Sequence, residues 1–394
     1  MFAQGGGERG VADRGCSGGL AGGGGATTLR ELRLATDCLE NDGRCIGSLA
    51  AEGRPQAGGG WRVGLEGSLL AGQLDYRPNL PQPLDISLMR LSLDGLTPEP
   101  EAMGSLFDEI ATPPEPAPFP DWVGELPDGR LRIADIERGG QRLGPFTARW
   151  QATPERLTVA PLGLTLGQIS ARGELVWEAA GAADTLTRAR LDLDGRDLGT
   201  AMERLGQDAV IRSGETRVQS QLAWPGAPWQ FALERSRGSV EVELRDGRFV
   251  NVASTSARLV GLLNVDNLVR RLRLDFSDVT GQGTAFDRVS GAATLYGGIL
   301  ETRGPVTVDG PATRFTLEGR VDLARRELDQ RLGVTVPISR NLPLAAVLAG
   351  APVVGGALFI ADRLFGDALD RVTRIHYRVR GPWTAPQISV ESAE

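Results

Sequence analysis

The chain has 394 residues, and its 43 basic side chains against 50 acidic ones leave a net charge of −7. Phosphate binding requires clustered cations, so this acidic balance argues against a general nucleic-acid binder. The sequence contains no lysine, which excludes a Walker-type phosphate loop. The length allows two or three ordinary domains or one elongated repetitive structure.

The first 60 residues are rich in glycine. Glycine runs occupy positions 5–7 and 22–25, and the apolar core of a signal peptide is missing. We interpret residues 1–60 as a disordered or wrongly assigned start, as expected for the C-terminal piece of a longer protein or for a gene model that begins late. The three cysteines, at positions 16, 38 and 45, have an odd count and no C-x-x-C spacing, which supports neither a disulfide framework nor a zinc site.

From residue 61 onwards, short segments of alternating apolar and polar residues are separated by glycine, proline and aspartate. Examples are residues 131–136, 189–194, 216–222, 239–244 and 314–318, each of which places its hydrophobic side chains on one face. The pattern predicts a mainly β fold, an elongated curved antiparallel sheet with one polar and one apolar face. Hairpin turns are predicted at the Asp-Gly pairs 94–95, 128–129, 194–195, 246–247 and 309–310.

Short helical inserts interrupt the predicted strands. A proline-rich stretch at 98–120 is typical of a loop, with a short helix at 101–110, and further helices are predicted near 197–207, 253–272 and 341–366. The unit of strands, turn, strand and helical insert recurs, which suits a sheet that grows by adding strands.

The residues that catalysis or metal binding would need are missing. The one histidine, His376, lies inside an alternating strand rather than beside a nucleophile. Asp192 and Asp194 precede Gly195 as in a calcium loop, but the later glutamate of that loop is absent, so we interpret them as acids at a strand-to-turn junction. We expect a protein that is not an enzyme and that uses no metal and no cofactor.

An apolar segment near the C-terminus has the length of a bilayer span. Residues 342–361 run for 20 positions without a charge, between Arg340 and Asp362. Pro343, Pro352 and several glycines weaken a single helix. Three interpretations stay open: a helical pair that contacts a membrane or caps a groove, buried helices, and a transmembrane helix.

Several segments in the second half of the chain resemble YhdP-type proteins of the AsmA-like superfamily. The resemblance is carried by residues 239–249 (SVEVELRDGRF) and 261–291, followed by 304–310 (GPVTVDG), 317–323 (LEGRVDL) and 377–383 (YRVRGPW). Before residue 238 the resemblance is looser. It divides the chain into an AsmA-like β-repeat region at 61–238 and a YhdP-type C-terminal β region at 239–394.

The resemblance implies a β-groove with an apolar inside and a periplasmic location in a Gram-negative-type cell envelope, with anchoring to the inner membrane in the full-length family member. It also implies a function, help in moving phospholipid between the inner and outer membranes. The implied partners are phospholipid acyl chains and a membrane, with envelope proteins as possible further partners. The alternative is a periplasmic structural or assembly factor for outer-membrane biogenesis, whose β core is filled.

Three sets of residues follow as candidates for these roles. The lipid-groove candidates are the alternating apolar residues Leu131, Ile133, Leu191, Leu193, Val240, Val242, Leu244, Phe315, Leu317, Val334 and Val336. The membrane-contact candidates are Leu344, Val347, Leu348, Val353, Val354, Leu358 and Phe359. The family-motif residues, to which we assign a structural role, are Arg270, Arg271, Asp275, Phe276, Asp278, Phe286 and Asp287.

Overall fold

The computed structural model describes residues 29–94, 117–250, 285–336 and 373–393, apart from positions 42, 182, 312, 383 and 384. The strands are β1 (Leu32–Asn41), β2 (Arg44–Pro55), β3 (Trp61–Glu66), β4 (Leu70–Tyr76), β5 (Leu84–Ser92), β6 (Gly129–Arg138), β7 (Gln141–Leu143), β8 (Phe146–Thr153), β9 (Arg156–Leu166), β10 (Ile169–Ala179), β11 (Thr185–Gly195), β12 (Ile211–Arg212), β13 (Glu215–Pro225), β14 (Arg237–Phe249), β15 (Ala285–Tyr296), β16 (Ile299–Thr302), β17 (Val306–Asp309), β18 (Arg314–Asp322), β19 (Glu327–Val336), β20 (Thr373–Pro382) and β21 (Gln387–Ala393). The helical elements are α1 (Trp122–Glu125), α2 (Leu198–Arg204) and the short 3-10 turns η1 (Pro228–Gln230) and η2 (Leu233–Arg235).

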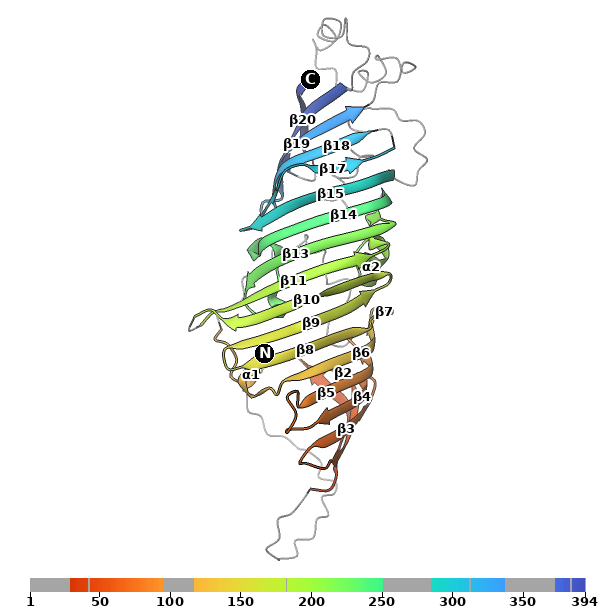
Figure 1. Ribbon diagram of the computed structural model, residues 1–394, viewed down its shortest axis with the longest axis vertical. Coiled ribbons are helices and arrows are strands. Elements are labelled where there is room, and N and C mark those ends of the chain that lie inside the picture. Colours follow the sequence, from red (N-terminus) through yellow and green to blue (C-terminus); the bar gives the residue numbers. More distant parts are fainter. Residues whose placement is uncertain are drawn as a thin grey trace, which may run out of the picture.

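All 21 of these strands belong to one sheet. In Figure 1 they follow one another along the long axis of an elongated molecule, from β3 at the lower end to β20 near the upper end. Neighbours in the sheet are mostly neighbours in sequence, as in a meander. The mainly β, antiparallel fold predicted from the alternation is therefore confirmed.

One of the described pairings, between β5 and β6, is parallel. Parallel neighbours require the chain to return to the same end of the sheet, which a tight turn cannot do. The proline-rich stretch predicted at 98–120 falls in the long connection between these two strands.

The pairing register sorts the side chains onto two faces. Leu193, Val218 and Val242 lie opposite one another on β11, β13 and β14, and the next positions along β13 and β14 pair Arg217 with Glu243. Because the side-chain period of a strand is two, every strand that keeps this register adds to both faces. We call these the apolar face and the polar face.

Ion pairs cross between neighbouring strands on the polar face. The Nε of Arg62 lies 2.7 Å from Asp75, and the Nε of Arg320 lies 2.8 Å from Glu301. Exposed pairs stabilise little individually, but like the rest of this face they specify which side of the sheet meets water. Other cross-strand pairs are Arg130–Asp85, Arg188–Glu178, Arg303–Glu241 and Arg378–Asp329.

The sheet begins earlier than residue 61, where the alternating pattern was predicted to start. β1 and β2 form an antiparallel hairpin within the region interpreted as a disordered or wrongly assigned start. Their apolar residues are sparse among glycine and alanine, and Leu34 remains 62% exposed at the end of the apolar face. Such strands are held by backbone pairing rather than by burial, so hydrophobic alternation gave no signal for them.

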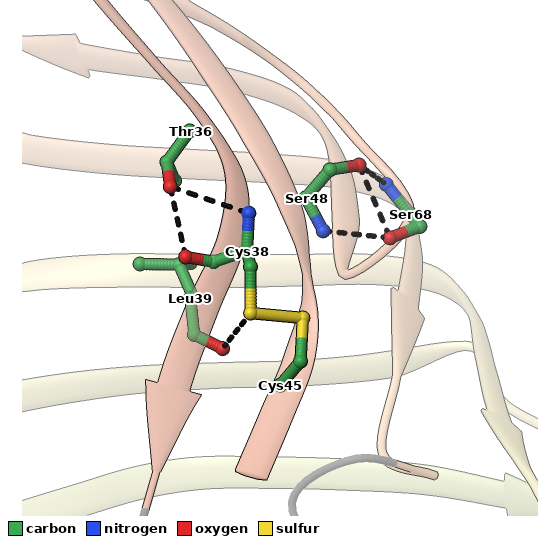
Figure 2. Close-up of a disulfide and its surroundings, with 6 residues drawn as sticks. All are labelled: Thr36, Cys38, Leu39, Cys45, Ser48 and Ser68. Carbon is green, nitrogen blue, oxygen red and sulfur yellow. Dashed lines mark hydrogen bonds between the residues drawn. A yellow bond between two sulfur atoms is a disulfide. The ribbon is translucent and has the colours of Figure 1, made fainter. Parts of the chain in front are cut away.

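A disulfide joins β1 to β2, contrary to the prediction from the cysteine count. Cys38 and Cys45 are bonded, with their Cα atoms 5.4 Å apart. Figure 2 shows the bond beside a bulge in β1, where the Thr36 hydroxyl accepts a hydrogen bond from the backbone N–H of Cys38. The prediction was wrong because an odd number of cysteines does not prevent a hairpin from bringing two of them together. The third cysteine, Cys16, lies outside the described residues.

The Asp-Gly pairs are not all hairpin turns. Asp309 and Gly310 do lie at the turn between β17 and β18, where the Gly310 N–H donates to the Thr313 carbonyl at 2.9 Å. Asp246 and Gly247 instead lie inside β14, whose pairing with β15 continues past them, and Asp246 has a φ of 50°. The turn predicted at 246–247 was therefore wrong, because a strand irregularity uses the same left-handed backbone that a turn does.

Among the predicted helices, the one near 197–207 is confirmed as α2. The predicted helices at 101–110, 253–272 and 341–366 lie outside the described residues, as does the apolar segment 342–361. Within the described part of the chain, no helix is long and apolar enough to cross a membrane.

Candidate functional site

The apolar face brings most of the groove candidates of the central strands together. Leu191 and Leu193 of β11 face Ser220 and Val218 of β13, which in turn face Val240 and Val242 of β14. Leu244 continues the β14 row opposite Thr216. These candidates therefore occupy adjacent positions on one surface.

The remaining candidates lie on the same face further along the sheet. On β6, Leu131 and Ile133 face Ala148 and Phe146 of β8. Near the C-terminal end, Phe315 faces Val334, and Leu317 faces Leu332. Val336 is the last residue of β19, and its side chain is outside what the structure describes.

The candidates differ in burial. Leu244, Ile133 and Val334 expose only 2 to 3% of their surface, and Phe315 exposes 8%. Leu131, Leu191, Leu193, Val240, Val242 and Leu317 are half-buried. The apolar face thus contains both packed clusters and a surface that the described residues leave partly open.

Part of one edge of the apolar face is covered by α2, which lies against β7, β9 and β12. Asp197 precedes the helix with a φ of 52°, its carboxylate accepts a hydrogen bond from the Thr200 hydroxyl at 2.5 Å, and the Ser213 hydroxyl accepts one from the Leu198 N–H at 3.1 Å. Ala201, 2% exposed, packs on the strand ends below it. We call this edge the helical rim; its buried strand residues are Leu88, Ile133, Ile136, Leu143, Leu166 and Ile169.

At the opposite edge, tryptophans of β10 and β13 pack with aromatic side chains from two loop insertions. Trp177, 2% exposed, has its ring centroid 4.8 Å from that of Phe119 and 5.3 Å from that of Trp229. The Trp224 indole N–H donates to the Ala227 carbonyl at 3.0 Å, which fixes the second insertion. We call Phe119, Trp122, Trp177, Trp224 and Trp229 the aromatic rim.

The two rims sit at opposite ends of the same strands. On β10, Ile169 belongs to the helical rim and Trp177 to the aromatic rim, and both point to the apolar face because they are eight positions apart. The sequence analysis did not identify the aromatic rim. Its available signal was the segment 224–229, in which two tryptophans flank a proline-rich turn.

The charged groups with shifted pKa values in the strand pairs lie on the polar face. Burial raises the pKa of Asp75, but hydrogen bonds from Arg62 and Gln73 and the charges of Arg62 and Arg77 outweigh it, so the net pKa is lowered. The pKa of Asp85 is lowered chiefly by its hydrogen bond from Arg130. On the apolar face, burial raises the pKa of Tyr377. The two carboxylates whose pKa is lowered by arginine therefore lie on the polar face, and the tyrosine whose pKa is raised by burial lies on the apolar face.

The residues weighed for catalysis or metal binding are placed apart. His376 lies on β20 opposite Gly333 and Ser392, on the polar face, and Asp194 is 3.6 Å from the Nε of Arg217. Within the described ranges, no group of three or more histidine, cysteine, aspartate or glutamate residues could hold a metal ion.

Two of the family-motif residues are described. Phe286 is 2% exposed and packs with its ring centroid 5.1 Å from that of Phe249, whereas Asp287 is exposed. The other motif residues, Arg270, Arg271, Asp275, Phe276 and Asp278, lie outside the described residues, as do all the membrane-contact candidates.

Comparison with known proteins identifies a family. The model of the family described as YhdP protein matches residues 22–388. The intermembrane phospholipid transporter YhdP of Escherichia coli (strain K12) is 28% identical over 372 residues. That match covers 93% of this chain but 28% of the relative, so the chain spans little more than a quarter of that protein's length. No solved structure matches the chain.

Proposed function

The chain belongs to the YhdP family, and from this premise we propose that it is one segment of a conduit for phospholipid. In this proposal the acyl chains lie on the apolar face between the helical rim and the aromatic rim, and the headgroup stays in water. The half-buried groove candidates of the central strands, Leu191, Leu193, Val240 and Val242, form the surface that the acyl chains contact.

One observation carries the proposal: a row of half-buried aliphatic side chains runs between two covered edges. Leu191, Val218 and Val242 are half-buried, while the ends of the strands beside them are buried under the rims. Apolar side chains that stay partly exposed across neighbouring strands are typical of a surface that binds an apolar partner. The name of the E. coli relative, a phospholipid transporter, indicates which partner.

The physical chemistry suits transport rather than catalysis. Acyl chains gain about 0.8 kcal/mol for each CH₂ group removed from water, and this gain does not depend on direction. A lipid can therefore slide along a uniform apolar strip without breaking specific bonds. No covalent step and no cofactor enter the proposal.

We place the segment in the periplasm of the cell envelope, anchored at the inner membrane in the full-length protein. The proposed organisation keeps residues 61–238 as an AsmA-like repeat region and 239–394 as the YhdP-type C-terminal region, and the residues near 344–359 as a membrane contact. The disulfide between Cys38 and Cys45 fits an oxidising compartment.

A scaffold for outer-membrane biogenesis is the second candidate, and the buried clusters favour it. Leu244, Phe315 and Val334 belong to a packed core rather than to an open surface. If the whole face were filled in this way, no room would remain for acyl chains.

Lipid uptake by the purified chain separates the two functions. The full chain is stripped of lipid, incubated with vesicles of phosphatidylethanolamine and phosphatidylglycerol, and re-isolated by size exclusion for phosphorus analysis. The conduit predicts at least one phospholipid for each folded chain. A folded chain that returns without phosphorus contradicts the conduit and favours the scaffold.

A further inference from the structure

The burial of the apolar face changes along the sheet. On β13 the row of apolar-face residues is buried at both ends, at Thr216 (2% exposed) and Trp224 (5%), and half-buried between them at Val218, Ser220 and Leu222. β10 and β15 repeat this pattern. We call the centre of β9, β10, β11, β13, β14 and β15 the open reach.

Small and large side chains pair across the open reach. Gly173 lies opposite Leu191 in the pairing of β10 with β11, and Gly291 lies opposite Val242 in the pairing of β14 with β15. Ser220 faces both Leu191 and Val240. A large residue thus repeatedly faces a small one, and neighbouring side chains lie over the two glycines, Leu191 over Gly173 and Val306 over Gly291. The open reach is open because its apolar row stays partly exposed.

The pattern ends at β19, where every apolar-face residue from Leu328 to Val334 is buried. Leu328, Leu332 and Val334 expose 3 to 4% of their surface, and Tyr377 and Val379 on the neighbouring β20 expose 4% and 2%. These five residues belong to one packed cluster. We call β19 and β20 the closed end.

A glutamine interrupts the apolar row at the closed end. Gln330 is 5% exposed, and within the described residues its side-chain oxygen is buried without a hydrogen-bond partner. A hydrocarbon chain has no hydrogen to donate to that oxygen and would keep water away from it. The closed end is therefore both filled and chemically unsuited to an acyl chain.

We infer that phospholipid acyl chains occupy the open reach and stop before β19, so that lipid enters and leaves this segment across a rim or from the β9 side. The inference rests on the proposed function. Six neighbouring strands span about 24 Å at the usual strand spacing. One leaflet of a bilayer is about 15 Å of hydrocarbon, so the open reach accommodates the full length of an acyl chain.

Site-specific photocrosslinking maps where the lipid lies. The full chain carries one substitution by p-benzoylphenylalanine at a time, Leu191 or Ser220 in the open reach, Leu332 at the closed end, and Asp192 on the polar face as the matched control. Each chain is incubated with radiolabelled phosphatidylethanolamine and phosphatidylglycerol vesicles and irradiated. Circular dichroism establishes that each variant is folded. Two open-reach positions are used so that the experiment still has one if the other variant does not fold.

We expect labelled lipid at Leu191 and Ser220, with at least tenfold less at Leu332 and Asp192. Label at Leu332 equal to that at Leu191 overturns the inference and leaves the conduit in place. Label at no position, with all variants folded, overturns the conduit and the inference with it. Label at Asp192 equal to that at Leu191 also overturns the inference, because lipid would then not distinguish the two faces.

Discussion

Leu191 and Ser220 lie directly opposite each other on β11 and β13, and the Ser220 hydroxyl donates a hydrogen bond to the Leu191 backbone carbonyl at 3.3 Å. The Ser220 hydroxyl therefore has a hydrogen-bond partner within the sheet, and this polar residue can lie on the apolar face without a bound water. Its small volume leaves the space that the proposed acyl chain needs.

Filling this space tests whether lipid uses it. We expect Ser220→Leu to fold with a free energy of unfolding within about 1 kcal/mol of the original, because the added side chain enters an open surface. If it displaces two CH₂ groups of lipid, binding falls by about 1.6 kcal/mol, or roughly tenfold. Titration with a fluorescent phospholipid measures the loss, and Ser220→Ala, which removes only the hydroxyl, serves as the control. Unchanged binding in Ser220→Leu contradicts the placement of the lipid.

The aromatic rim offers a comparison between two indoles. Within the described residues, the Trp177 N–H is buried without a partner, whereas the Trp224 N–H donates to Ala227. We expect Trp177→Phe to cost less stability than Trp224→Phe, since only the second loses a hydrogen bond worth about 1 kcal/mol. Trp177→Ala should cost about 3–5 kcal/mol because it empties the cluster. Urea denaturation ranks the three variants, and a larger loss for Trp177→Phe than for Trp224→Phe contradicts the assignment.

The ion pairs of the polar face predict a loss of stability in acid. The pKa of Asp75 is lowered from its ordinary 3.8, so the stability that its ion pair supplies is present above pH 3.8 and is lost as the pH falls through the lower folded value. Asp75→Asn should lose about 1–3 kcal/mol at pH 7, because it leaves Arg62 without its charged partner, and should depend less on pH below 4.

Denaturation at pH 7 and pH 3 measures both effects. Asp192→Asn, at an exposed position of the same face, is the control and should change stability by less than about 0.5 kcal/mol. An Asp75→Asn chain as stable as the original at pH 7 would show that the pair contributes nothing.

The disulfide predicts the behaviour of the first hairpin. Two of the three cysteines should resist alkylation until a reductant is added, which mass spectrometry counts directly. Closing so short a loop is worth about 2 kcal/mol in the chain-entropy description, so reduction should speed proteolysis at β1 and β2 and leave β9 to β15 protected. Three reactive cysteines in chain isolated under oxidising conditions would contradict the bond.

Whether an element of this fold could be predicted from the sequence depends on which interaction positions that element. The two faces followed from alternation, because a strand with Leu191 and Leu193 inward must place Asp192 and Asp194 outward. The hairpin at 32–55 could not be predicted from alternation, because backbone pairing and a disulfide stabilise it with little burial. The left-handed residue Asp246 inside β14 was taken for a turn, since an Asp-Gly pair suits both.

The candidate site was predictable in part for the same reason. Alternation identified which residues share the apolar face, but not that Leu191 is half-buried while Val334 is 3% exposed. That difference arises from contacts between distant segments: the insertions near Phe119 and Trp229, the helix at Ala201, and the packing of β19 against its neighbours. Periodicity carries no information about such contacts.

Native mass spectrometry with lipid extraction tests the central claim most directly. The full chain, purified in mild detergent, is compared with the double variant Leu191→Asp, Val242→Asp and with Gln219→Asp, Gln221→Asp, which adds the same charge on the polar face. We predict bound phospholipid in the original chain and in the polar-face variant, and its loss in the apolar-face variant. Equal lipid in all three folded chains, or lipid in none of them, would contradict an apolar face that carries phospholipid.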